Sequence, residues 1–149
     1  MSPEQMWKEF TDTCPEYAGQ NYEAWPYGGA PDELAELTLN GIKTATASAH
    51  ILYELENAPL PRPGDLSVVL DGRDEAVCVI RTTRVSVLPF RQVPARHAYL
   101  EGEGDRSLAY WREVHRSFFA RELKEAGLDF TPDMQVVCEE FERIWPRKD

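Results

Sequence analysis

Two runs of apolar, β-branched residues in the middle of the chain constrain the fold most. They are Leu66–Leu70 and Ala76–Val87, and Asp71-Gly72-Arg73-Asp74 lies between them. An Asp-Gly pair between two apolar runs is typical of a β-hairpin, since both residues tolerate the backbone of a tight turn. The sequence therefore predicts two antiparallel strands at the centre of the fold.

Capping residues and hydrophobic periodicity predict the elements around this hairpin. Ser2, Pro3 and Gln5 are the pattern of a helix start with a capping box. Asp105 is expected to cap the longest helix. Residues 15–31, rich in Pro, Gly and aromatics, are expected to be an ordered loop. The expected elements are helices over residues 2–13, 32–39, 95–99 and 106–126, an extended segment over 43–48, and a closing strand over 135–145.

Helices near both ends, with several strands between them, indicate an α+β domain. The small number of strands and the hairpin favour a small, mostly antiparallel β-barrel flanked by helices. The 149 residues show neither internal repeats nor a linker, and a chain of this length buries roughly 68–70% of its unfolded surface. A single domain over residues 1–149 is therefore expected.

Charge and cysteine content exclude several classes of partner and site. The chain has 16 basic and 26 acidic residues, a net charge of −10, which disfavours long double-stranded DNA because that affinity comes from neutralising phosphates. A nucleoside or a short RNA in a locally basic pocket remains open. Three cysteines without a CxxC spacing indicate neither a disulfide framework nor a zinc site. With no signal peptide and no apolar run of about 18 residues, a cytoplasmic protein without membrane contact is expected.

The segment Gly41-Ile42-Lys43-Thr44-Ala45-Thr46 is the first candidate site. A glycine directly after a helix turns the chain, so Lys43 emerges where helix and strand meet. A partly desolvated lysine there can accept a proton, act as a nucleophile or bind a phosphate. The spacing alone favours a surface lysine after an ordinary glycine cap. The segment is not a phosphate-binding Walker loop, because the first glycine and the preceding strand are missing.

The segment Glu101-Gly102-Glu103-Gly104-Asp105 is the second candidate. Its alternating carboxylates can supply oxygen ligands or a general base, and a solvated loop is the alternative. His97 lies four residues before Glu101, and His115 is expected on the inner face of the long helix. Histidine and carboxylates can bind a divalent cation, with Glu101, Glu103 and His97 as the candidate ligands. Buried histidines with ordinary hydrogen bonds are commoner, so no cofactor or metal is expected.

Taken together, the segments resemble the ASCH domain, a relative of the PUA fold, over about residues 25–145. The family signature G-x-K-x-x-T is matched by Gly41, Lys43 and Thr46. Each motif is short, and their order and spacing along the chain carry the resemblance. The matching segments are Tyr27-Gly28, PDELAELTLNGIKTATAS, LPRPGDLSVVLDG, VCVIRTTRVSVLPF, HAYLEGEGDRSLAYWREVHRSFF and MQVVCEEFERIW.

The resemblance implies a small barrel with a cleft that receives RNA or a nucleoside. In the branch that removes the acyl group from N4-acetylcytidine, a lysine and a threonine of the signature act with a glutamate. Lys43 and Thr46 match the first two, and Glu101 is the positional match for the third. This chain is longer than the minimal amidohydrolases and adds the EGEGD loop and a long helix. Other ASCH proteins resemble ribonucleases or RNA-binding modules.

The sequence thus predicts a hydrolase acting on an acylated nucleoside or on RNA. Lys43 would activate water or be the nucleophile, Glu101 would relay the proton, and Thr46 would orient Lys43 or bind the oxyanion. The alternatives are a non-catalytic RNA-binding module in translation or RNA metabolism and an inert dimerising domain; a homodimer is possible in either class. The expected substrate-binding residues are Gly41, Thr44, Trp25, Tyr27, Glu103, Arg106 and Trp111.

Overall fold

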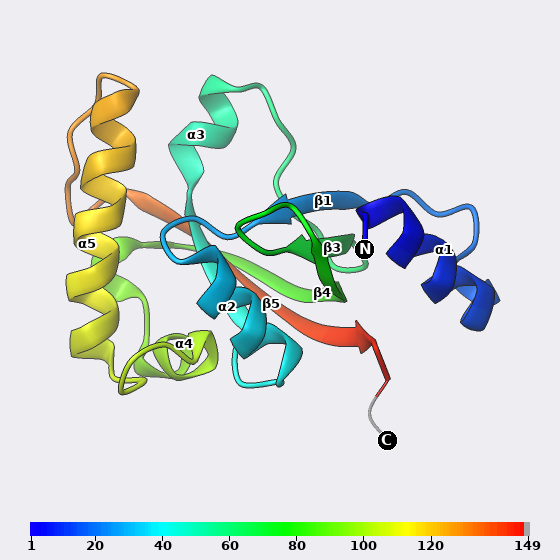
Figure 1. Ribbon diagram of the computed structural model, residues 1–149. Helices are drawn as coiled ribbons and strands as arrows, with labels where there is room; N and C mark the ends of the chain where they lie inside the picture. Colours follow the sequence, from blue (N-terminus) through cyan, green and yellow to red (C-terminus); the bar gives the residue numbers. More distant parts are fainter. Residues whose placement is uncertain (148–149) are drawn as a thin grey trace.

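A curved five-stranded sheet forms the centre of the computed structural model, which describes residues 1–147 (Figure 1). The first two strands of the sheet order pair in parallel, and every other neighbouring pair is antiparallel. This half-barrel with flanking helices confirms the predicted fold class. In spatial order the strands are β1 (Glu23–Pro26), β3 (Leu66–Leu70), β4 (Ala76–Pro89), β5 (Gln135–Trp145) and β2 (Ala45–Ala49).

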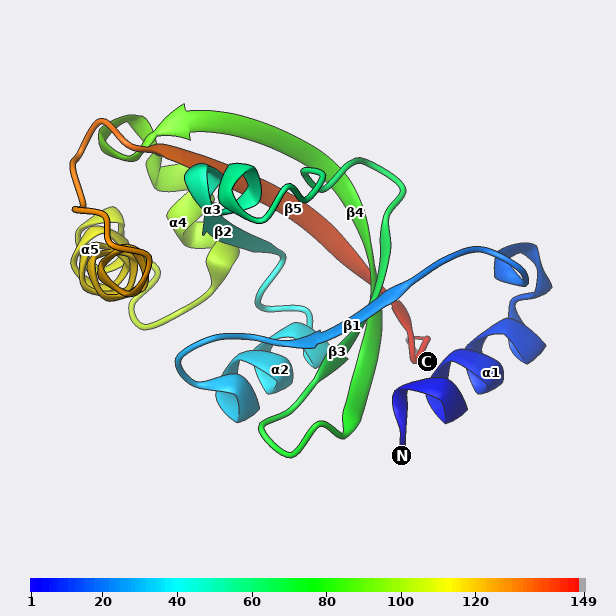
Figure 2. The ribbon, with the colours of Figure 1, turned by 90° about the horizontal axis from the view of Figure 1, so that it is seen from above.

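Helices cover the two ends and the faces of this sheet. Figure 2 shows α1 and α5 at opposite ends of the molecule, with the long strands β4 and β5 running side by side between them. Two short 3-10 turns, Pro15–Tyr17 and Phe90–Gln92, join elements at these ends. The helices are α1 (Pro3–Thr13), α2 (Pro31–Leu39), α3 (His50–Leu55), α4 (Ala95–Glu101) and α5 (Leu108–Glu125).

The hydrophobic core is divided into three clusters along the curved sheet. At one end Met6 and Phe10 of α1 pack against β3 and β4. In the middle Ala35 of α2 packs against the other face of the same strands. At the far end Trp111 and Phe119 of α5 pack against β5 and the 3-10 turn after β4. Burial of each large side chain contributes about 1.5–3 kcal/mol, so α1 and α5, at the two ends of the molecule, are fixed to the sheet.

Several predicted boundaries agree with the structure. The hairpin strand Leu66–Leu70 and the closing strand over residues 135–145 are confirmed as predicted. The capping box of α1 is also present: the Gln5 N–H donates to Ser2 Oγ, and the Ser2 N–H donates to Gln5 Oε1. Local sequence signals were sufficient for these elements.

The expected extended segment 43–48 forms strand β2 from Ala45 onwards. Two expectations about local structure were wrong. Residues 15–31 are more than a loop, because they contain β1. The long helix begins at Leu108, and Ser107 caps it by accepting a hydrogen bond from the Tyr110 N–H. Asp105 instead accepts from the Ser107 N–H and so shapes the turn that precedes the helix.

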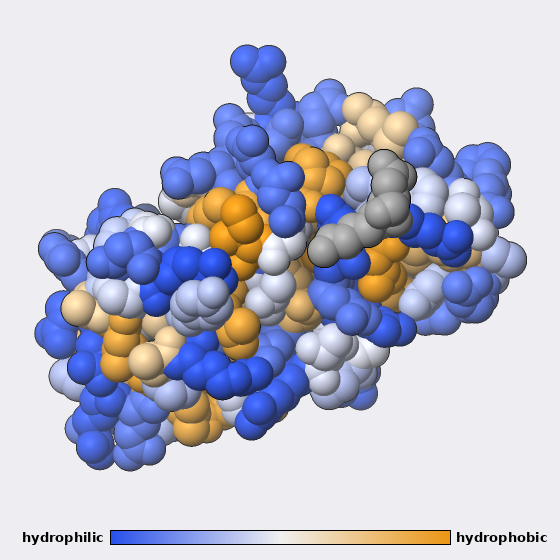
Figure 3. Space-filling view, turned by 90° about the horizontal axis from the view of Figure 1, so that it is seen from below, coloured by the Kyte–Doolittle hydropathy of each residue, from blue (hydrophilic) through white to orange (hydrophobic). Residues whose placement is uncertain are grey.

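The cysteines and the surface bear on the remaining expectations. Cys14, Cys78 and Cys138 are free and buried, and burial raises the pKa of Cys78 and Cys138 to about 12. Within residues 1–147, no helix combines the length and the apolar character needed to cross a bilayer. On the face that Figure 3 shows, hydrophobic residues form separate patches among hydrophilic ones.

Candidate functional site

The turn between α2 and β2 directs Lys43 into the protein. Gly41 takes a left-handed backbone conformation with φ of 76°, which glycine adopts without a steric cost. The Ile42 and Lys43 N–H groups then both donate to the Leu37 carbonyl, at 3.0 and 3.1 Å. Because the chain reverses so tightly, the Lys43 side chain points inwards, and it is only 1% exposed. The interpretation of Lys43 as a surface residue is therefore wrong.

The buried Lys43 amine has three hydrogen-bond acceptors. Its Nζ donates to the Ala45 carbonyl at 2.8 Å, and to Glu101 Oε1 and Glu103 Oε2 at 3.2 Å each. The ring of Tyr27 adds a cation–π contact, with Nζ 5.1 Å from the ring centroid. An ammonium has three N–H donors and no acceptor. The surroundings of Lys43 therefore match a charged ammonium on all three donors.

Glu101, the last residue of α4, is 1% exposed and accepts from four groups. Besides Lys43, these are Trp111 Nε1 at 2.6 Å, His97 Nε2 at 2.7 Å and His115 Nε2 at 3.5 Å. Burial alone would raise the pKa of Glu101, but the Lys43 charge and the two histidines hold it well below the usual range. Glu101 is thus a fixed anion that organises the groups around it.

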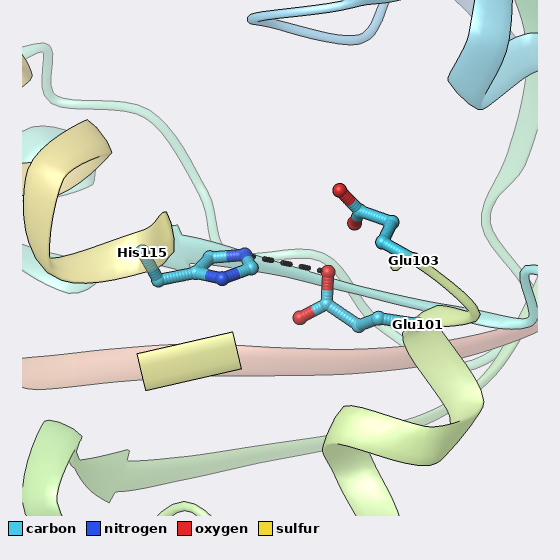
Figure 4. Close-up of side chains that lie close together, drawn as sticks. All are labelled: Glu101, Glu103 and His115. Carbon is cyan, nitrogen blue, oxygen red and sulfur yellow. Dashed lines mark ion pairs between the residues drawn. The ribbon is translucent and has the colours of Figure 1, made fainter. Parts of the chain in front are cut away.

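His115, on α5, completes the cluster from the opposite side (Figure 4). Its ring points towards the Glu101 carboxylate. Its Nδ1 lies 2.9 Å from the Trp111 carbonyl, which can only accept a hydrogen bond. Both ring nitrogens therefore face acceptors and favour the imidazolium. Burial lowers the pKa of His115, but the bond to Glu101 and its charge prevail, so the pKa is raised.

Glu103 lies beside this cluster in a different environment. Its side chain remains 19% exposed and has Lys43 as its only hydrogen-bond partner within the described chain. Burial and repulsion from Glu101 raise the pKa of Glu103, while the Lys43 charge lowers it, and the net shift is upwards. Two glutamates only two positions apart therefore differ: the pKa of Glu101 is lowered, whereas that of Glu103 is raised.

Two adjacent cavities meet at the signature threonine. The smaller has a volume of about 270 Å³ and is lined by Lys43, Glu101, Glu103 and His115, among others. The larger, of about 520 Å³, lies on the inner face of the half-barrel, and every strand of the sheet contributes to its wall. Thr46 lines both cavities, as do Tyr27, Gly28 and Ala47. Because they share these lining residues, the two cavities form one cleft with a smaller end at Lys43 and a larger end.

The larger end contains functional groups that the sequence did not indicate. Glu139 of β5 accepts a hydrogen bond from Thr82 Oγ1 at 2.6 Å. The Tyr53 hydroxyl of α3 forms a hydrogen bond with Ser48 Oγ at 2.8 Å, and both residues also line this cavity. The signal for Glu139 was available, since it is a charged residue inside the predicted closing strand. Tyr53 lies on a short helix with no sequence signal of comparable strength.

The predicted site residues divide into two groups. Lys43, Thr46, Glu101 and Glu103 converge as expected, and Trp25 and Tyr27 line the larger cavity. The second group lines neither cavity: Gly41 shapes the turn, Trp111 is 2% exposed and donates to Glu101, Thr44 packs beside Leu100, and Arg106 stacks on Tyr99, 3.7 Å from its ring centroid. Expected contacts between this second group and a substrate therefore have no support from the cavity geometry.

The carboxylates also form a set with metal-ligand spacing. Ligand atoms of Glu101, Glu103 and His115 all lie within 4.8 Å of one another. His97, the histidine expected in such a set, forms a hydrogen bond with Glu101 Oε2, whereas His115 faces Glu101 Oε1. The Lys43 ammonium binds both carboxylates of this set. A divalent cation there would have to displace Lys43 or overcome its repulsion, so the donor set fits an ammonium better than a metal ion.

Comparison with known proteins gives a consistent result. The model of the ASCH domain family matches residues 23–145. The crystal structure of an ASCH domain from Lactobacillus crispatus JV V101 is 32% identical with a TM-score of 0.88, over 94% of this chain and 92% of that one. A protein from Enterococcus faecalis V583 is 34% identical with a TM-score of 0.84, over 95% and 86% of the two chains. A search of curated proteins found no match.

Proposed function

This chain belongs to the ASCH domain family, which is generally thought to bind RNA, and we propose that it hydrolyses the acyl amide of a modified nucleoside. One observation carries the proposal. A buried lysine, held by two carboxylates with opposite pKa shifts, lies at a cavity wall beside a threonine hydroxyl. Acid–base active sites use burial and neighbouring charges to shift the pKa values of adjacent titratable groups in opposite directions, and Glu101 and Glu103 show such opposite shifts.

The groups of the smaller cavity take complementary roles in this reaction. Glu103 accepts the proton of a water molecule that attacks the amide carbonyl, and later gives it to the leaving amine. As Glu103 takes up the proton, its hydrogen bond from Lys43 weakens, and the freed Lys43 N–H and the Thr46 hydroxyl donate to the oxyanion that forms. Glu101 holds Lys43 in position. We therefore propose Glu103, rather than Glu101, as the proton carrier, because all the contacts of Glu101 are already committed.

The charges that line the cleft favour a nucleoside over an RNA phosphodiester. The larger cavity has Glu23, Asp65 and Glu139 against a single cation, Arg62. The smaller has Glu33, Glu101 and Glu103 against Lys43, Arg121 and His115. A backbone phosphate gains affinity from unpaired cations, whereas the cations here face at least as many carboxylates. A neutral amide on a neutral sugar-base unit encounters no such repulsion.

Substitutions that remove one functional group at a time test the proposal. Lys43→Met keeps the methylene chain without the ammonium, and Thr46→Val removes only the hydroxyl. Both are expected to reduce hydrolysis of N4-acetylcytidine by roughly 10²–10³-fold. Lys8→Met, at a lysine whose side chain is 77% exposed, is the matched control and should act like the native chain. Product formation is followed by chromatography, and melting curves show that each variant is folded.

The same assay separates this proposal from its alternatives. Cleaved RNA without deacylation would identify a ribonuclease, and RNA binding without any product would identify a binding module. Because Lys43 binds the carboxylates of the candidate metal site, we expect the hydrolysis to continue in the presence of a chelator. Equal rates for native protein and both variants, with any N-acyl nucleoside, would disprove the hydrolase.

A further inference from the structure

Glu139 is one of the charged residues of the larger cavity that the proposed chemistry does not use. Thr82 Oγ1 donates to its Oε2 at 2.6 Å. Within residues 1–147, the other carboxylate oxygen, Oε1, accepts no hydrogen bond. It is not among the fully buried polar atoms that lack a partner, so it is accessible. Since Glu139 lines the cavity, the free oxygen is available to a ligand there.

The register of the sheet places Glu139 next to Thr46, at the junction with the smaller cavity. Thr46 and Glu139 are directly opposite each other on the antiparallel strands β2 and β5. Side chains at such positions lie on the same face, with Cβ atoms about 4.5–5.5 Å apart. A ligand held by Glu139 is therefore adjacent to Thr46, where the two cavities meet.

Flat side chains line the same cavity as the carboxylate. They belong to Trp25 of β1, Tyr53 of α3 and the prolines of the segment 59–61. The volume of about 520 Å³ lies within the range of roughly 300–1,000 Å³ typical of small-ligand sites. Aromatic and proline walls suit a planar ring, and a carboxylate oxygen suits an N–H donor on its edge.

We infer that the larger cavity is a base-recognition site in which Glu139 accepts an N–H group from an amino-substituted heterocycle. The inference rests on the proposed function for its nucleoside scaffold, and it adds which ring is accepted. A base with a carbonyl at the same position would place an acceptor against the Glu139 oxygen. A polar site that cannot pair its buried group rejects such an analogue strongly.

Binding of unmodified nucleosides tests this inference without any chemistry. Calorimetry would compare cytidine with uridine, and adenosine with inosine, at mildly alkaline pH. Within each pair the amino group is replaced by a carbonyl. The native protein is expected to bind the amino member of at least one pair about tenfold or more tightly, as the loss of one buried hydrogen bond implies.

Two variants and one control complete the test. In Glu139→Gln the preference should fall below about threefold, because an amide offers both a donor and an acceptor. Thr82→Val keeps the carboxylate but removes its orienting hydroxyl, and should weaken the preference partially. Glu140→Gln is the matched control, since this neighbour pairs with Arg96 outside the cavity and should leave binding unchanged.

The outcomes distinguish this inference from the proposed hydrolysis. If no acyl nucleoside is hydrolysed but the amino preference is present and depends on Glu139, the base site stands and the hydrolase does not. Equal binding of both members of each pair by native protein, no binding of any nucleoside, or a preference that survives in Glu139→Gln would overturn the base site.

Discussion

Glu101 and Glu103 show how the surroundings of a residue decide its chemistry. Both are glutamates beside the same lysine, yet the pKa of one is lowered and that of the other is raised. The difference lies in the number of donors: Glu101 accepts from Trp111, His97 and His115 as well as Lys43. Glu103 has only Lys43. We therefore propose that Glu101, the residue that the family resemblance singled out, anchors Lys43 and that Glu103 acts as the base.

Changing Glu103 to glutamine tests the assignment of the base. Loss of a positioned general base costs about 10²–10⁴-fold in kcat. In the native protein kcat/KM should rise with pH through the pKa of Glu103, which lies above the ordinary 4.5 of a glutamate. The Glu103→Gln variant should lose this rise of kcat/KM with pH. If the rise is unchanged in Glu103→Gln, another residue is the base. Glu9→Gln, on the exposed face of α1, is the control.

Changing Glu101 to glutamine should mainly affect stability. Removing one charge from a buried ion pair costs about 3–5 kcal/mol, or about 10 °C in Tm for a chain of this size. The lowered pKa of Glu101 means that its contribution is present above about pH 4.5 and is lost as the pH falls through the folded value. The raised pKa of His115 adds stability below about pH 6.5, which is lost as the pH rises through its folded value.

The Tm difference between native protein and Glu101→Gln should therefore be largest in the mildly acidic range. It should narrow as the pH is lowered from there, and also as it is raised. Melting curves over a pH series measure this directly. A difference that does not vary with pH would mean that Glu101 contributes packing only.

The sequence predicted the site residues that belong to short local motifs, and it missed those whose position depends on the pairing of distant strands. Lys43, Thr46, Glu101 and Glu103 belong to two motifs whose residue types and spacing carry a signal. Their inward orientation did not follow from that spacing, since it depends on the turn after α2. Glu139 stood out as a charged residue in the predicted closing strand, but its place beside Thr46 appears only once β5 pairs with β2.

At the scale of elements, the end of α4 must fit closely against the turn before β2. Gly102 ends the helix with φ of 74°, and a Cβ there would lie 2.7 Å from the Ile42 carbonyl oxygen. The Thr44 N–H donates to the Leu100 carbonyl across the same contact at 2.8 Å. This close backbone approach holds Glu101 against Lys43.

Alanine at Gly102 should therefore cost more than alanine at another left-handed glycine. The backbone conformation alone costs about 1 kcal/mol, and the clash with backbone atoms adds about 1–3 kcal/mol. Gly127→Ala is the matched control, since Gly127 has φ of 76° and a Cβ added there would meet nothing within 4 Å. Urea unfolding of both variants measures the difference, and equal losses would contradict the tight contact.

The elements predicted well are those that local chemistry determines. Capping residues indicated α1, apolar runs on either side of an Asp-Gly turn indicated β3 and β4, and a β-branched, aromatic run with partial alternation indicated β5. Strand β1 was missed because Glu23-Ala24-Trp25-Pro26 has little β-propensity and forms a strand only by pairing in parallel with β3, more than forty residues away. Long-range pairing of this kind leaves no local pattern.

At the scale of the whole molecule, the net charge of −10 determines which ligands can approach. Binding to phosphates would release counterions and weaken steeply as salt increases. We expect nucleoside binding to change less than about twofold between low and physiological salt, because a neutral ligand releases no counterions. Calorimetry with cytidine at several salt concentrations checks this. A steep decrease with salt would indicate that the cleft binds a phosphate instead.

Two further expectations concern the whole chain and remain predictions. A homodimer is possible, and sedimentation at several protein concentrations would detect it. The single-domain organisation over residues 1–149 predicts one cooperative unfolding transition. Residues 148–149 lie outside the described part of the chain.

The pairing of Thr46 with Glu139 has a consequence for substrate length. Side chains alternate between the two faces of a strand, so a slip of one residue between β2 and β5 would move one of the two out of the cleft. The spacing between Thr46, where the two cavities meet, and Glu139 in the larger cavity is therefore set by backbone hydrogen bonds rather than by flexible side chains. We therefore expect the cleft to prefer substrates whose carbonyl is joined to the ring through a single nitrogen, and to discriminate against molecules with a longer spacer even when both ends are chemically suitable.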